Sequence, residues 1–214
     1  MDTLLPFALL CLTSFFTLTN PLGTMPVFLT MTQGMTEKER RFIVTRATLT
    51  AFIIIMVFTF GGQFLFKFFG ISTNGFRIAG GFIIFKIGFD MLQARYTPMK
   101  LKDEEIKTYA NDISITPLGI PMLCGPGAIA NAIVLMQDAT TVELKGVLIG
   151  SIAFIYLLTY FILRASTRLV DLLGETGNNV MMRLMGLILM VIAVECFVSG
   201  VKPILIEVLA EGCR

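Results

Sequence analysis

The chain is most constrained by two stretches rich in proline and glycine, at 20–26 (NPLGTMP) and 116–131 (TPLGIPMLCGPGAIAN). Each lies within an apolar segment long enough to cross a bilayer. Proline lacks the N–H that a helix interior needs, and glycine leaves the backbone loose. Broken backbone at membrane depth is tolerated only where protein buries it or where it lines a water-filled cavity. Two broken spans therefore point to a site inside a membrane protein.

The composition supports this interpretation. Of the 214 residues, 55% are hydrophobic and 15% are charged, and the mean hydropathy is +0.81. Soluble domains carry roughly a quarter charged residues, so we predict a polytopic membrane protein. The first apolar segment has Asp2 in place of a basic region and is not followed by a small-residue cleavage site. We expect it to be a retained span and not a removed signal peptide.

Windows of about 20 apolar residues predict the fold class, an all-α membrane protein with six transmembrane helices. Polar segments separate the windows, and a short amphipathic helix is expected at 203–210. The first and fourth helices should be broken at the two proline- and glycine-rich stretches. The predicted spans lie at about 4–31, 43–69, 77–93, 113–137, 144–163 and 180–201.

The two halves of the chain resemble each other, which predicts an inverted repeat of three plus three helices. The first repeat would cover 1–93 and the second 113–201, with a cytoplasmic linker at 94–112 and a C-terminal tail at 202–214. Residues at offsets of 105 or 106 match between the halves: Asn20 with Gly125, Arg77 with Arg183, and Asp90 with Glu195.

A broken span supplies groups that bind charge. The half-helix after Pro21 or Pro126 begins with unpaired N–H groups and the positive end of its dipole, which attract a carboxylate. Asn20 is well placed to cap the first of them. The half-helix before each break ends in carbonyls that suit an ammonium group, so the predicted substrate is a small zwitterionic amino acid.

The alternative interpretation is that the breaks are helix kinks, satisfied locally, whose purpose is packing. The residues expected at a substrate site are Asn20, Pro21, Leu22, Gly23, Thr24, Pro26, Cys124, Gly125, Pro126, Gly127, Ala128 and Asn131.

Three ionisable residues are expected inside the spans. Lys86 lies about 13 Å along its helix from Arg77, and Asp90 lies four residues further on the same face. Glu195 occupies the position in the second half that corresponds to Asp90. Intramembrane charges of this kind serve proton coupling or form a structural ion pair, and the sequence leaves both open. Arg77 and Arg183 are interpreted as interface anchors.

Other classes of function are disfavoured. The chain has no histidine, and its four cysteines lack metal-like spacing, so no cofactor, metal site or enzymatic activity is expected. It has no GxxxxGK[ST] loop for direct use of ATP, and we expect no nucleic-acid partner. The expected partners are the lipid bilayer, the substrate and protons. Gly146 and Gly150 form a GxxxG motif, which is compatible with a homo-oligomer.

Four segments together resemble the MarC family of bacterial inner-membrane proteins, which is also described as a family of small neutral amino acid transporters. These segments are 20–28 (NPLGTMPVF), 76–81 (FRIAGG), 125–129 (GPGAI) and 176–186 (TGNNVMMRLMG). The resemblance extends over essentially the whole chain. The family's signature prolines and glycines map onto Asn20, Pro21, Gly23, Pro26, Gly125, Pro126 and Gly127.

The resemblance implies six spans and transport of small amino acids such as glycine or alanine, coupled to a proton gradient. This chain has Cys124 where alanine is usual, and Ala130 and Asn131 where relatives commonly carry small hydroxyl residues. The alternative function is a channel or an exporter for a cation, a metal or another small metabolite. Metal export would need clustered ligands at the midplane, where Asp90 and Glu195 are the candidates.

The distribution of basic residues predicts the orientation in the cytoplasmic membrane of a bacterium. Eleven Lys and Arg residues flank the links after the first, third and fifth spans, and five lie on the other side. Because basic residues favour the cytoplasm, both termini should face outward. Single-cysteine labelling from outside should modify residue 2 and spare residue 102. Labelling of residue 102 in intact cells would contradict both the topology and the inverted repeat.

Overall fold

A computed structural model describes residues 4–32, 34–93, 110–166 and 170–212, and throughout these ranges the regular structure is helical, with no strand. Most of the predicted linker, 94–109, lies outside the described residues. The helices in chain order are α1 (Leu4–Thr19), α2 (Pro21–Met31), α3 (Glu37–Phe69), α4 (Thr73–Leu92), the irregular helix η1 (Ser114–Leu123), α6 (Pro126–Asp138), α7 (Val142–Ser166) and α8 (Val170–Gly212).

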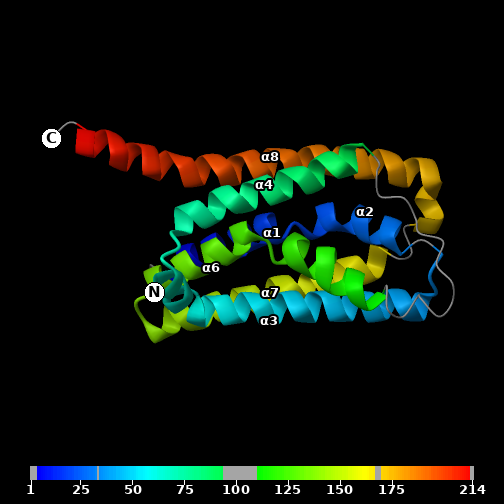
Figure 1. Cartoon of the computed structure of the whole chain (residues 1–214). Helices are drawn as coiled ribbons and strands as arrows, with labels where there is room; N and C mark the ends of the chain where they lie inside the picture. The colour runs from blue at the N-terminus through cyan, green and yellow to red at the C-terminus, as the bar shows by residue number, and fades with distance from the viewer. Residues whose placement is uncertain (1–3, 33, 94–109, 167–169, 213–214) are drawn as a thin grey trace.

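The helices run along one common direction as an elongated bundle (Figure 1). From the N-terminal end, α1 and α2 run the length of the bundle, α3 returns, and α4 runs forward again. Then η1 and α6 lead back, α7 runs forward, and α8 returns to the end from which α1 started. The two ends of the chain therefore lie at the same end of the bundle.

The bundle has two outer helix pairs with the broken helices between them. One outer pair is α3 with α7, and the other is α4 with α8 (Figure 1). Between them, α1 packs against α7 and η1 packs against α3, while α2 packs against α8 and α6 packs against α4. Both interrupted helices thus pack between the two pairs, although α1 also has an exposed face with Leu5, Leu9 and Leu10.

The outer surface has the apolar character of a lipid-facing surface. On α3, one stripe is exposed and the opposite stripe, which includes Ala47, Ala51 and Ile55, is buried. A contiguous exposed apolar patch of this size is not expected on a soluble monomer. The exposed stripe consists of Leu49, Ile53, Val57, Phe60 and Phe64.

Within the described ranges, four helical segments are long and apolar enough to cross a membrane: Leu4–Leu29, Glu37–Phe69, Val142–Ser166 and Gly186–Ala210. A fifth candidate is the pair Ala110–Leu123 and Pro126–Asp138, which is bent by 55° at its break. The remaining long helix, α4, has 20 residues but carries Arg77, Lys86 and Asp90. These charges explain why composition alone does not identify α4 as a span.

Helix α3, which contains the second predicted span, begins at Glu37 and not at the predicted start, residue 43. Thr36 and Glu39 form a capping box: the Thr36 Oγ1 accepts from the Glu39 N–H at 3.4 Å, and the Thr36 N–H donates to Glu39 Oε2 at 2.8 Å. The cap satisfies backbone donors of the first turn, so the helix includes the charged residues before the apolar run. The helix ends at Gly70, which has the left-handed φ of 64°.

The predicted separate helix at 203–210 is wrong, and the described part of the predicted polar link at 164–179 is helical. Helix α7 continues to Ser166, and α8 is one helix of 43 residues from Val170 to Gly212, with Pro203 inside it. Residues 167–169 are outside the described ranges. Polar residues mark where a chain leaves the bilayer, but a helix can continue through them into water.

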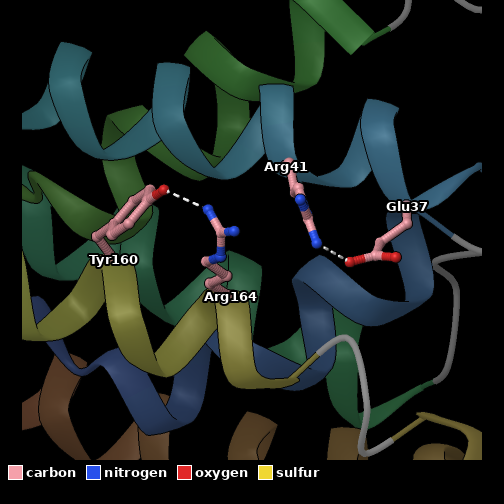
Figure 2. Close-up of polar contacts among 4 residues, drawn as sticks. All are labelled: Glu37, Arg41, Tyr160 and Arg164. Atoms are coloured by element: carbon pink, nitrogen blue, oxygen red, sulfur yellow. Dashed lines mark hydrogen bonds and ion pairs between the residues drawn. The ribbon is translucent and has the colours of Figure 1, made fainter.

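Basic side chains gather between α3 and α7 at the end of the bundle opposite the chain termini. Figure 2 shows Arg41 on α3 and Arg164 on α7 pointing into the space between these helices. Arg41 forms an ion pair with Glu37, and Arg164 donates a hydrogen bond to the Tyr160 hydroxyl at 2.8 Å. Exposed pairs of this kind stabilise a fold by at most about 1 kcal/mol, so their position is more informative than their energy.

Glycines allow α4 and α8 to pack with their backbones close together. A Cβ added at Gly88 would lie 2.8 Å from the Gly186 carbonyl oxygen, and one added at Gly186 would lie 2.7 Å from the Gly88 carbonyl oxygen. At Gly81, an added Cβ would lie 2.9 Å from the Ala193 carbonyl oxygen. No larger residue fits these positions without separating the helices.

We therefore predict that Gly88→Ala lowers the thermal stability of the purified protein in detergent, because overpacking costs roughly 1–3 kcal/mol. The matched control is Gly146→Ala on α7, where an added Cβ meets no atom within 4 Å. This control should be neutral or slightly stabilising, because alanine is the better helix former by about 1 kcal/mol. Equal melting temperatures for the two variants would contradict the close contact between α4 and α8.

Candidate functional site

The break between α1 and α2 is confined to Asn20, which has a positive φ of 43°. Its backbone remains bonded as in a helix, because its N–H donates to Phe16 at 3.0 Å and its carbonyl accepts from Thr24 at 3.0 Å. Its side chain caps α2, because Oδ1 accepts from the Gly23 N–H at 3.1 Å. The predicted cap at Asn20 is thus present, and the N-terminus of α2 is partly satisfied by its own cap.

Gly23 is needed to make room for the cap. A Cβ at Gly23 would lie 2.3 Å from Asn20 Nδ2 and 2.8 Å from Asn20 Cγ. The sequence Asn-Pro-x-Gly therefore has a local explanation: asparagine caps, proline takes the first helical position where no N–H is needed, and glycine accommodates the capping amide.

The second break is larger and less regular. Within η1, two residues have extended backbone: Thr116 has φ −131° and ψ 122°, and Ile120 has φ −130° and ψ 128°. Each precedes a proline, and the proline ring disfavours helical geometry in the residue before it. The chain ends η1 at Leu123, and α6 begins at Pro126.

The N-terminus of α6 has no side-chain cap. Gly125 is the N-cap residue in extended conformation, and Pro126 occupies the first helical position. The first backbone bond of the helix runs from the Ile129 N–H to the Gly125 carbonyl at 3.0 Å. The N–H groups of Gly127 and Ala128 therefore lie at the positive end of the helix without a partner within it.

The two breaks meet at a small central cavity. Asn20, Gly125, Gly127 and Ala128 line it, with apolar side chains of α4 and α8 opposite them. Its volume is about 30 Å³. This is room for about one water molecule and not for an amino acid, so the centre of the bundle is closed in this structure.

Asn20, which lines the central cavity, has an unused donor. Its Nδ2 atom is buried and has no hydrogen-bond partner among the described residues. The orientation of the amide follows from the cap, because reversing it would place the NH₂ group against the Gly23 N–H. A buried donor without a partner costs about 1–3 kcal/mol, so this position favours a water or a ligand acceptor.

The other residues predicted at the breaks are arranged differently. Thr24 is buried and its hydroxyl donates to the Asn20 carbonyl at 3.1 Å. Cys124 is buried outside the cavity lining, and Leu22 is 49% exposed. Pro21 and Pro26 are buried within α2. These residues shape the break, and the structure does not bring them to the central cavity as ligands.

A second, wider cavity lies next to the first, and we call it the side cavity. It has a volume of about 310 Å³ and is lined by Asn131 and Glu195, together with Arg77 and Thr17. Asn131 donates to the Ser14 hydroxyl at 3.1 Å. The two cavities share four lining residues: Leu18, Gly127, Ile192 and Cys196.

The three charged residues predicted inside the spans are not equivalent. Glu195 is exposed and lines the side cavity, whereas the exposed Lys86 and the half-buried Asp90 of α4 line neither cavity. Lys86 and Asp90 form no ion pair with each other or with another described residue. The structural pair that the sequence left open on α4 is therefore not formed in this structure.

Arg77 is the charged residue at this site that was not predicted to be a site residue, because it was interpreted as an interface anchor. It faces the same cavity as Glu195 because α8 packs along α4, with the Cys196 Sγ at 3.5 Å from the Arg77 carbonyl oxygen. The sequence feature that could have identified Arg77 as a site residue was its position in the FRIAGG motif. Only the packing of distant helices shows which charged residues face one cavity.

The family model described as "MarC family integral membrane protein" matches residues 5–205. The chain belongs to the MarC family. It is 38% identical to the UPF0056 membrane protein YvbG of Bacillus subtilis, over 88% of this chain and 91% of that protein. It is 34% identical to a UPF0056 membrane protein of Methanocaldococcus jannaschii, over 94% of this chain and 99% of that protein. No solved structure matches significantly.

Membership confirms the family recognised from the motifs and makes this chain an integral membrane protein. A relative from Aquifex aeolicus, 32% identical over 90% of this chain, has the same description as a UPF0056 membrane protein. These names describe membrane proteins and specify no substrate. Members of the MarC family occur in archaea as well as in bacteria.

We predict that Gly23→Ala removes the Asn20 cap and lowers stability by about 0.5–2 kcal/mol, as measured by thermal unfolding in detergent. In an Asn20→Ala background, the same substitution should cost much less, because the clash is with the Asn20 side chain. This double-mutant cycle isolates the contact. An equal cost of Gly23→Ala in both backgrounds would show that the loss arises elsewhere in α2.

Proposed function

We propose that this MarC family protein is a secondary transporter that moves small neutral amino acids, such as glycine and alanine, across the cytoplasmic membrane by alternating access. The observation that carries the proposal is the meeting of two helix breaks at one cavity inside the bundle. Irregular backbone inside a bilayer is otherwise costly, and transporters place substrate sites at such breaks.

The central cavity supplies donors for a carboxylate. The N–H groups of Gly127 and Ala128 lie at the uncapped start of α6, and Asn20 Nδ2 approaches from the other break. A helix N-terminus favours an anion through both its free N–H groups and its dipole. Glycine at 125 and 127 keeps the backbone accessible and the cavity small, which favours small substrates.

The proposed architecture is six spans in an inverted three-plus-three repeat, and the helix contacts support it. Exchanging the halves pairs α1 with η1, α2 with α6, α3 with α7 and α4 with α8. Under this exchange, the α1–α7 contact becomes the η1–α3 contact, and the α2–α8 contact becomes the α6–α4 contact. The pairs α3–α7 and α4–α8 become themselves, as a two-fold axis between the halves requires.

The proposed orientation places both termini outside. The two chain ends lie at one end of the bundle, and the basic cluster around Arg41 and Arg164 lies at the other (Figures 1 and 2). Basic residues favour the cytoplasmic side. The side cavity adjoins the central cavity, which is closed to anything larger than water. Transport then requires the central cavity to widen and to open to the two sides of the membrane in turn. The proposed coupling ion is the proton.

We expect proteoliposomes containing the protein to take up labelled glycine and alanine faster in a pH gradient than without one, and to exclude large or charged amino acids. Gly127→Val should reduce uptake to the level of protein-free liposomes, because its methyl groups fill the central cavity near Leu18 and Cys196. The matched control is Gly150→Val on α7, where no atom lies within 4 Å of an added Cβ.

Two outcomes would contradict these proposals separately. If no amino acid in a full panel is taken up by the wild-type protein in either gradient direction, the proposed function is wrong. If glycine uptake survives in a well-folded Gly127→Val variant, the protein is a transporter whose substrate path avoids the central cavity.

A further inference from the structure

The side cavity has the size and polarity of a ligand site. Its volume of about 310 Å³ lies at the lower end of the range for small-molecule pockets, roughly 300–1,000 Å³. The central cavity is about a tenth of that size. The polar side chains that line the side cavity are Thr17, Arg77, Asn131, Glu195 and Ser199.

Arg77 and Glu195 carry opposite charges into this cavity without pairing. Among the described residues, no side-chain hydrogen bond or ion pair satisfies either group, and the two are not within the 4.0 Å of an ion pair. Charged groups within a membrane protein are costly unless they are paired or hydrated. Two opposite charges that line one cavity without pairing therefore suit a ligand that carries both charges.

The packing of α4 on α8 fixes the separation of these charges. On one side of the pair, Gly200 abuts the Asn74 carbonyl oxygen, and on the other side Gly81 abuts the Ala193 carbonyl oxygen. Between them, Cys196 contacts the Arg77 carbonyl. The backbones that carry Arg77 and Glu195 are thus held in register, so that both residues line the same cavity.

The side cavity also adjoins the proposed transport site. It shares Leu18, Gly127, Ile192 and Cys196 with the central cavity. Arg77 lies four residues from the start of α4, which begins at the end of the bundle where both chain termini lie (Figure 1). A solute in the side cavity would therefore lie between that end of the bundle and the helix breaks.

We propose that the side cavity is the entry site for the zwitterionic substrate, with Arg77 binding its carboxylate and Glu195 binding its ammonium group. This inference rests on the proposed transporter function and adds the residues that recognise the substrate. Arginine binds carboxylates with paired N–H donors, and hydrogen bonds between charged groups are the stronger ones. A neutral side chain on the substrate follows from the site, because a third charge would meet no partner there.

The test is direct binding of labelled glycine to the purified protein in nanodiscs. Arg77→Gln and Glu195→Gln should each weaken glycine binding by about 10- to 100-fold, as expected for loss of a hydrogen bond between charged groups. Methylamine lacks the carboxylate and acetate lacks the ammonium group, so both should bind the wild-type protein far more weakly than glycine. In Arg77→Gln, glycine should bind no better than methylamine binds the wild type.

Matched controls lie on the same helix as Glu195. Lys202→Gln and Glu207→Gln change exposed charges of α8 outside both cavities and should leave glycine binding unchanged. Arg77→Lys retains the charge without the paired donors and should bind with intermediate affinity, which separates loss of recognition from loss of folding. Size-exclusion profiles of all variants give a second check on folding.

The outcomes separate this inference from the proposed function. Glycine binding that depends on Arg77 and Glu195 supports the entry site even without measurable transport. Wild-type affinity in both folded glutamine variants, together with gradient-driven uptake, would overturn the entry site and leave the transporter intact. Absence of glycine and alanine binding to the wild-type protein would overturn both.

Discussion

The satisfaction of backbone polar groups is the constraint on which the rest of this structure depends. Prolines remove helix donors at both interrupted helices, and the bilayer offers no water to replace them. Both interruptions lie inside the bundle, between the α3–α7 pair and the α4–α8 pair, where other parts of the protein can satisfy these groups. The two cavities follow from this arrangement, because irregular backbone and polar side chains from several helices are brought together between the pairs.

The two breaks satisfy their backbone groups in different ways. At Asn20 the asparagine side chain caps the next helix and the backbone bonds of that residue continue in both directions. At Gly125 no side chain can cap, and the prolines of η1 distort the preceding segment, which produces the 55° bend. The second break therefore leaves free helix donors, while the first contributes a side-chain amide.

Close packing by glycine links the outer helices to the breaks. Gly80 on α4 would bring an added Cβ to 2.0 Å from the Pro126 ring, so the α4 backbone rests against the start of α6. Gly88 and Gly186 hold α8 against α4 at the same time. The motif glycines thus hold together the helix pair that carries Arg77 and Glu195, and a change in this packing would reach both cavities.

The sequence by itself determined the helical membrane class, the family and the positions of both breaks, because apolar length, proline and glycine act locally along the chain. It also predicted the Asn20 cap, whose partners are three residues apart. It misplaced the start of α3 and divided α8, because capping and helix continuation do not follow hydropathy. Only the tertiary structure decided that Arg77 and Glu195, from helices far apart in sequence, face one cavity, because that depends on how α4 packs on α8.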